Sequence, residues 1–172
     1  MEWNIEKLTQ ENAERIAGWN FPKDYAWTTL GKGSENEYFL LRENYRKDSY
    51  FQVIKEGALM GYFSVNDRIR KEAGALQVVI DPKAETTDEK TFLSEMESYI
   101  KANYPVIESI NVMAYSTQTK AIDLYEQQGY ENHGVLSSFG HDMSSYEQDG
   151  FNTDEKGNYI PEIQLVVLSK KM

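Results

Sequence analysis

The sequence contains no cysteine, so neither a disulfide nor a thiolate nucleophile or metal ligand can belong to this chain. It has only two histidines, His133 and His141, which are too few to form a metal site by themselves. No apolar run approaches membrane-spanning length, and residues 1–20 lack the profile of a signal peptide. We therefore expect a cytoplasmic protein with no bound metal and no membrane segment.

Positive charge is also scarce, because 18 lysines and arginines face 28 acidic residues and leave a net charge of −10. This balance argues against non-specific binding to nucleic acid and to anionic membrane surfaces. It would favour an amine-bearing substrate, although solubility is the simpler explanation of the charge. The length of 172 residues suits one domain with a sizeable core, and no repeat or linker divides it. We expect a single domain over residues 1–172.

Glycine is missing between Gly74 and Gly129. Within that gap, DPKAETTDEKTF (81–92) leaves a strand-like run and enters a helix-like pattern. A strand, a tight loop and a helix start often form a phosphate site, where glycines let the phosphate approach the backbone. Here the loop is acidic instead, and Thr86 with Glu89 forms the pattern of a capping box. This pattern predicts a helix that begins within a residue or two of Thr86, and a cost of about 1 kcal/mol for Thr86→Ala.

The first half of the chain predicts two helices and a hairpin. LTQENAERIAGW (8–19) has a capping Thr9 and a terminating Gly18, and SENEYFLLRENY (34–45) begins with a capping box. The strand-like runs 49–57 and 58–66 meet at Glu56 and Gly57.

The second half alternates strands and helices. The strand-like segments are ALQVVI (75–80), which is apolar enough to be buried on both faces, SINVMAY (109–115), and the late segments 129–139 and 163–171. The helical segments are one that starts near Thr86 and one at 117–128, and a polar loop covers 144–159. This order predicts a mixed α/β domain around one central sheet, with parallel pairing and a right-handed crossover in the middle.

Residues 118–130, QTKAIDLYEQQGY, resemble the motif Asn-x-x-Ala-x-x-Leu-Tyr-x-x-x-Gly-Phe/Tyr of the GNAT acetyltransferases. The preceding VVIDP places Pro82 where that family has its strand-ending proline, and the element order is similar over nearly the whole chain. The matching residues are Ala121, Leu124, Tyr125, Gly129 and Tyr130, while Gln118 stands where asparagine is usual.

The resemblance implies a GNAT-like acyl-CoA N-acyltransferase fold, with acetyl-CoA as co-substrate and a primary amine of a small molecule or peptide as acceptor. It implies that Tyr125 protonates the leaving thiolate, although a tyrosine that only packs against the sheet is an equal alternative. It also implies that strands 75–80 and 110–114 are parallel neighbours that separate near Pro82. The cofactor-binding residues that it implies are Val78, Val79, Ile80, Thr86, Thr87, Asp88 and Gln118.

The loop departs from the family pattern Arg/Gln-x-x-Gly-x-Gly/Ala, because Glu85, Asp88 and Lys90 stand at the matching positions. Acidic side chains repel phosphate, so a second interpretation stays open: a non-catalytic binding or regulatory domain that has lost affinity for acetyl-CoA. No general base stands out, because Glu72 and Asp81 fit surface carboxylates. The aromatic residues Trp19, Phe21, Tyr25 and Trp27 fit core packing better than the wall of an acceptor pocket.

Overall fold

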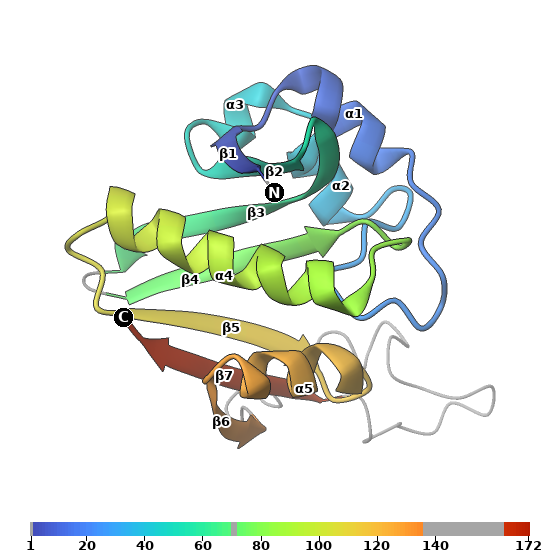
Figure 1. The fold of residues 1–172 in the computed structure, drawn as a ribbon. Helices are drawn as coiled ribbons and strands as arrows, with labels where there is room; N and C mark the ends of the chain where they lie inside the picture. Colours follow the sequence, from blue (N-terminus) through green and yellow to red (C-terminus); the bar gives the residue numbers. More distant parts are fainter. Residues whose placement is uncertain (1, 70–71, 136–163) are drawn as a thin grey trace, which may run out of the picture.

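The structure is a computed structural model that describes residues 2–69, 72–135 and 164–172. Its centre is a seven-stranded mixed sheet in the order β1-β2-β3-β4-β5-β7-β6 (Figure 1). The strands are β1 (Trp3–Lys7), β2 (Tyr50–Lys55), β3 (Ala58–Ile69), β4 (Glu72–Ile80), β5 (Ser109–Tyr115), β6 (Glu131–Val135) and β7 (Leu165–Lys171). The helices are α1 (Gln10–Ala17), α2 (Glu35–Leu40), α3 (Glu43–Arg46), α4 (Thr86–Asn103) and α5 (Thr119–Gln127).

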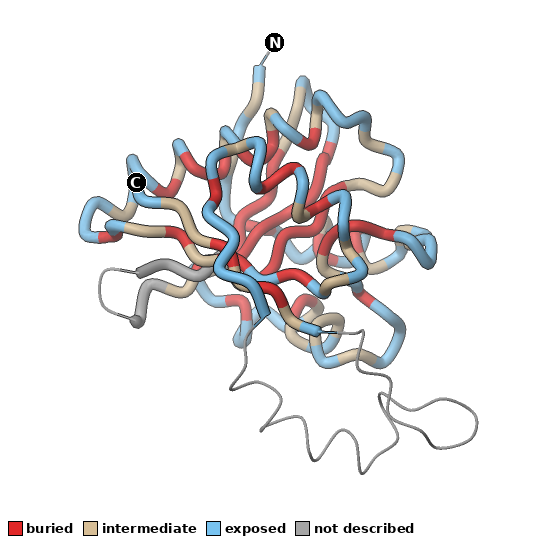
Figure 2. Tube along the Cα trace, turned by 90° about the horizontal axis from the view of Figure 1, so that it is seen from below, coloured by how far each residue is buried: buried red, intermediate tan, exposed pale blue. Residues whose placement is uncertain are grey.

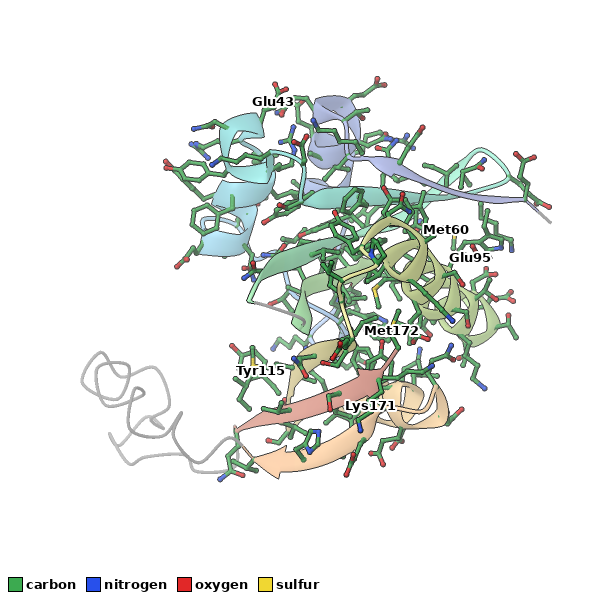
Figure 3. The ribbon with its side chains drawn as sticks, turned by 90° about the vertical axis from the view of Figure 1, so that its left-hand side faces the viewer. Glu43, Met60, Glu95, Tyr115, Lys171 and Met172 are labelled. Carbon is green, nitrogen blue, oxygen red and sulfur yellow. The ribbon has the colours of Figure 1, made fainter. Side chains whose placement is uncertain are left out.

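Helices cover both faces of this sheet. Figure 3 shows α2 and α3 on one side of the strands and α4 and α5 on the other. Each side has its own apolar cluster: Phe92 and Leu124 belong to the α4/α5 side, whereas Ile16 and Leu40 belong to the α1/α2 side. The buried positions in Figure 2 accordingly gather along the central strands and the inner helix faces.

At three places the structure confirms features predicted from short-range sequence signals. Thr9 Oγ1 accepts the backbone N–H of Asn12 at 3.1 Å, and Gly18 ends α1 as predicted. Ser34 Oγ likewise accepts from Glu37 N at 3.2 Å. At the hairpin, Glu56 and Gly57 both have positive φ, 49° and 83°, which is the requirement of a type I′ turn.

Other boundaries differ from the prediction. Strand β1 was missed, because five residues that pair only with β2 at the sheet edge give a weak alternating pattern. The segment 34–45 forms two short helices, α2 and α3, rather than one. The prediction of strand beyond Val135 and the predicted loop 144–159 lie outside the described residues.

The parallel strands β4 and β5 separate along their length. Their register pairs run only from Glu72 with Ser109 to Gly74 with Asn111, while β4 continues to Ile80 and β5 to Tyr115. The prediction of parallel neighbours that part towards Pro82 is confirmed. We call the space between the unpaired halves of β4 and β5 the β4–β5 gap.

Candidate cofactor site in the gap between β4 and β5

Two residues of β4, Val78 and Ile80, turn their main-chain N–H and C=O groups towards this gap. Asp81 N, two residues beyond Val79, donates to Met60 O of β3 at 2.8 Å, so the main-chain groups of Val79 also face β3. Because successive residues of a strand turn their main-chain groups to opposite edges, Val78 and Ile80 turn theirs to the gap. Of the three predicted backbone contacts, Val79 therefore faces β3, and Val78 and Ile80 are the two that could hold a ligand.

The chain itself occupies these groups through residues 25–28. Thr28 N donates to Val78 O at 3.0 Å, and Val78 N donates to Thr28 Oγ1 at 3.2 Å. Ile80 N donates to the Tyr25 hydroxyl at 2.9 Å, and that hydroxyl donates to Ile80 O at 2.5 Å. All four main-chain groups on this stretch of the β4 edge are therefore satisfied by the chain's own residues.

This segment belongs to the connection between α1 and α2, which runs around the carboxyl end of β4 (Figure 1). Tyr25 and Trp27 are buried in the cluster on the α4/α5 side, whereas Leu30 is buried in the cluster on the α1/α2 side. The connection thus passes from one face of the sheet to the other at the gap. The interpretation of Tyr25 and Trp27 as core residues is confirmed.

Gln118 joins this segment to β5. Its Oε1 accepts the backbone N–H of Tyr115 at 2.9 Å, and its Nε2 donates to Trp27 O at 2.9 Å. Gln118 is also the residue that precedes α5, although its side chain does not cap that helix. Its amide therefore spans the gap from the end of β5 to residues 25–28.

Tyr125, the predicted proton donor, lies beneath this segment. It is 3% exposed, and its ring meets the ring of Trp27 edge to face at 5.5 Å. Burial raises the pKa of Tyr125 above its ordinary value, so the phenol keeps its proton at neutral pH. The residue is in the protonation state that a donor needs, and it is buried against the ring of Trp27.

Helix α4 begins at Thr86 as predicted, but the predicted capping box is wrong. The residue at the N-cap is Glu85, and no side chain caps the helix. Instead Glu89, 4% exposed, accepts the indole N–H of Trp27 at 2.7 Å and pairs with Lys120 at 2.9 Å. A carboxylate in the first turn is favoured by the helix dipole, and the Trp27 and Lys120 contacts offset its burial.

The other predicted cofactor-binding residues of the loop, Thr86, Thr87 and Asp88, are either exposed to solvent or paired with a side chain of the same protein. Thr86 and Thr87 are exposed. Asp88 forms an ion pair with Lys55 of β2 at 2.9 Å, and this hydrogen bond raises the pKa of Lys55. The loop therefore presents exposed hydroxyls and the backbone amides of the helix start, and the neighbouring cation of β2, Lys55, is already paired with Asp88.

These contacts predict a reversal of the expected mutational effects. Thr86→Ala should change the free energy of unfolding by less than about 0.5 kcal/mol, as for other surface changes. Glu89→Ala should cost about 2 kcal/mol, because a buried, charge-assisted hydrogen bond to Trp27 is lost. Chemical denaturation of the two variants tests this; a larger loss for Thr86→Ala would restore the capping box.

Other polar candidates lie elsewhere. Asp81 Oδ1 accepts the backbone N–H of Lys83 at 2.9 Å and so closes the turn after β4. His133 contacts Ser169 across β6 and β7 on an exposed surface. Within the described ranges, no group of acidic and histidine side chains could hold a metal ion, and no helix is long and apolar enough to cross a membrane.

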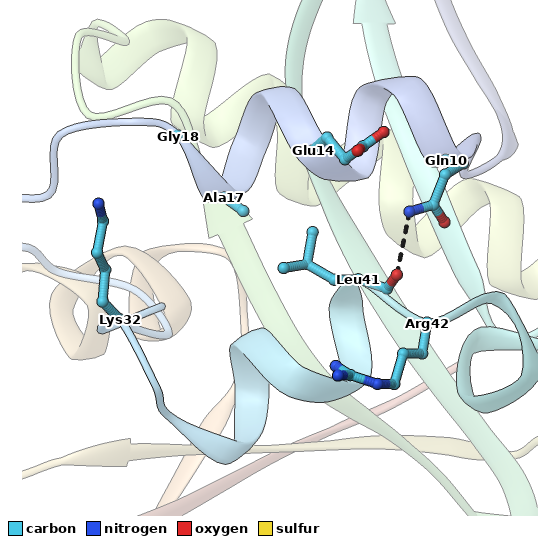
Figure 4. Close-up of a pocket in the computed structure, with 7 residues that line it drawn as sticks. All are labelled: Gln10, Glu14, Ala17, Gly18, Lys32, Leu41 and Arg42. Atoms are coloured by element: carbon cyan, nitrogen blue, oxygen red, sulfur yellow. Dashed lines mark hydrogen bonds between the residues drawn. The ribbon is translucent and has the colours of Figure 1, made fainter.

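Two cavities lie next to α1 or to the segment that follows it. One of about 260 Å³ lies beside the end of β4 and is lined by Trp19, Asp81 and Lys83, among others. A wider one of about 550 Å³ lies between α1 and α2, with Gln10, Lys32 and Arg42 at its walls (Figure 4). Gln10 Nε2 donates to Leu41 O across its floor at 3.0 Å.

The sheet thus opens between two parallel strands, and the start of α4 and the tyrosine-bearing helix α5 lie at the opening. The chain has the fold of the GNAT N-acetyltransferases. No protein-family model matches the sequence, and no curated protein is similar to it in sequence.

Three structures illustrate the likeness. A GNAT-family acetyltransferase from Bacillus cereus has a TM-score of 0.64 at 10% identity, covering 99% of this chain and 98% of its own. The spermidine N-acetyltransferase from Vibrio cholerae, solved with CoA and spermine, has a TM-score of 0.66 at 16% identity, over 98% and 95%. The ribosomal-protein-S18-alanine N-acetyltransferase from Escherichia coli has a TM-score of 0.63 at 12% identity, over 99% and 95%.

Proposed function

We propose that this protein is an acetyl-CoA-dependent N-acetyltransferase that acetylates a primary amine of a small molecule or peptide. The observation that carries the proposal is the β4–β5 gap within a GNAT fold. There, two parallel strands stop pairing after Gly74 and Asn111, and Val78 and Ile80 turn their main-chain groups into the opening. A strand edge of this kind suits an extended, amide-bearing ligand such as the pantetheine arm of CoA.

The site residues take the following roles in this proposal. Val78 and Ile80 hydrogen-bond the pantetheine through their main chains, and Gln118 orients it from the β5 side. The backbone amides at the start of α4, with Thr86 and Thr87, receive the pyrophosphate, since a helix N-terminus attracts anions without needing a particular side chain. Asp88 lies at this helix start and opposes the phosphate charge.

The chemistry is a direct transfer. The neutral amine nitrogen attacks the thioester carbonyl carbon, the carbon–sulfur bond breaks, and the thiolate leaves. Tyr125 donates its proton to that thiolate, which is more basic in a buried site than in water. The proton that the nitrogen loses on becoming an amide passes through water to the Tyr125 phenolate and restores the phenol. The acceptors named for similar structures, spermidine and an alanine of a ribosomal protein, are amines, and the net charge of −10 is compatible with a cationic acceptor.

The absence of cysteine makes the activity simple to measure. A thiol reagent added to the protein, acetyl-CoA and a panel of amines reports only released CoA, because the protein contributes no thiol. Tyr125→Phe should lower kcat by about 100-fold, the lower end for a general acid. Tyr99→Phe, a partly buried tyrosine of α4, is the matched control and should retain the rate. Equal rates for the two variants would remove Tyr125 from the reaction.

A second candidate is a non-catalytic GNAT-fold domain. The observation that favours it is the filled gap: residues 25–28 take the β4 edge, and the carboxylate of Glu89 already lies in the first turn of α4. Calorimetric titration with acetyl-CoA separates the two candidates. Heat of binding supports the transferase, and its absence in every variant described below supports the non-catalytic domain.

A further inference from the structure

Residues 25–28 contact β4 in the way that an added strand or an extended ligand would. Two donors and two acceptors of Val78 and Ile80 are each matched by one group of Tyr25 or Thr28. A main-chain N–H donates to one partner at full strength, and Thr28 N and the Tyr25 hydroxyl occupy the space in front of the two C=O groups on this edge. The segment and a ligand on the β4 edge therefore exclude each other.

The attachment of the segment permits release. Three of its four bonds to β4 involve a side-chain hydroxyl: two use Tyr25 and one uses Thr28. The segment is part of the connection between α1 and α2, and on its α2 side lie Gly31 and Gly33, around which there is space for a side chain. These positions allow the backbone to change direction without displacing packed neighbours.

We infer that residues 25–28 form a strap that competes with acetyl-CoA for the β4 edge, so that the cofactor binds only when the strap leaves. This inference rests on the proposed function. It also joins three events in one movement, because Trp27 packs against the buried Tyr125 and donates its indole N–H to Glu89. Release of the strap frees the β4 edge and removes the Trp27 ring from Tyr125. It also breaks the hydrogen bond from Trp27 to Glu89, so that Glu89 keeps only its ion pair with Lys120.

Removing a strap hydroxyl tests the competition directly. Tyr25→Phe deletes the hydroxyl that bonds Ile80, and Thr28→Val deletes the acceptor for Val78 N. Each change weakens the closed state and leaves the ligand's own contacts intact. Thr28→Val removes one hydrogen bond and should lower the calorimetric Kd for acetyl-CoA by about fivefold, whereas Tyr25→Phe removes two and should lower it by about 25-fold.

The matched control is Tyr62→Phe. Tyr62 is also a buried tyrosine, and its hydroxyl bonds Gln77 on the α1/α2 side of the sheet rather than the gap. The control should lose stability like Tyr25→Phe but bind acetyl-CoA with unchanged affinity. A structural role for Tyr25 alone predicts the same behaviour for both variants, so a tighter Kd confined to the strap variants is specific to competition.

Amide hydrogen exchange supplies a readout in the unmodified protein. Thr28 N is protected by Val78 O in the free state. Saturation with acetyl-CoA should abolish protection at Thr28, whereas Val78 and Ile80 should stay protected because the pantetheine replaces the strap as their partner.

The outcomes separate the two proposals. Binding by the unmodified protein with Thr28 still protected, and with no gain in the strap variants, overturns the strap and leaves the transferase standing. Binding that appears or tightens only in Tyr25→Phe and Thr28→Val supports both. Absence of binding in all proteins, including the double variant, overturns both the strap and the use of acetyl-CoA.

Discussion

Replacing Gly61 by alanine is expected to lower the free energy of unfolding by about 4 kcal/mol, through backbone strain and overpacking together. Gly61 has a φ of +148°, and a Cβ built there would lie 1.9 Å from Val79 O and 3.0 Å from Ile80 Cα. Both neighbours are main-chain atoms of β4 and cannot rotate away. Since Ile80 itself bonds Tyr25 at the gap, the same substitution should also disturb the strap contacts at Ile80.

Urea denaturation of Gly61→Ala beside Gly31→Ala provides the measurement. Gly31 has no atom within 4 Å of its Cβ position, so its substitution should change stability by less than about 0.5 kcal/mol. Two equal and small losses would show that β3 and β4 can move apart at Gly61. The close approach would then be dispensable for the shape of the β4 edge.

Much of the scaffold could be predicted because its signals are local. The strand 109–115 coincides with β5, and the helix start at Thr86 coincides with α4. Turn chemistry at Glu56 and Gly57 and the cap at Thr9 depend on neighbours within a few residues. Such signals act over one turn or one strand and can be read from a single sequence.

The contents of the gap could not be predicted, because they depend on residues that are far apart in the chain. Tyr25 lies 55 positions from Ile80, and Trp27 lies 62 positions from Glu89. The pattern at Glu89 fitted a local cap equally well, and only the approach of Trp27 decides where its carboxylate points. The aromatic residues after α1 indicated burial, but not which strand edge they bury.

The fold also explains why the acidic loop is tolerated. Asp88 has a partner in Lys55, Glu89 has partners in Trp27 and Lys120, and Glu85 is exposed. Two of the three acids are thus neutralised within the protein and do not require a ligand cation. These acids would weaken phosphate binding in two ways. They pair with Lys55 and Lys120 and lie in the first turn of α4, and they also repel the phosphate directly.

Restoring the family's loop pattern should therefore tighten acetyl-CoA binding at least tenfold, the equivalent of about 1.4 kcal/mol. The variant combines Glu85→Arg, Asp88→Gly and Lys90→Gly. It removes acidic charge at the helix start, clears side-chain bulk from the backbone amides and frees Lys55 for the pyrophosphate. The gain should exceed any gain in stability, because each glycine in the helix costs up to roughly 1 kcal/mol.

Calorimetric titration at fixed ionic strength tests the loop, with Glu11→Arg as the control. Glu11 is an exposed acid in the first turn of α1, and its substitution changes the net charge of the protein by the same amount as the loop variant. A general electrostatic effect would tighten binding equally in both, whereas a local effect appears only in the loop variant. The strap opposes the cofactor in all three proteins, so it cancels in the ratio of dissociation constants.

Micromolar binding by the unmodified protein without a gain in the loop variant would mean that the backbone amides of α4 hold the phosphates unaided. The acids at positions 85 and 88 would then have no part in the affinity.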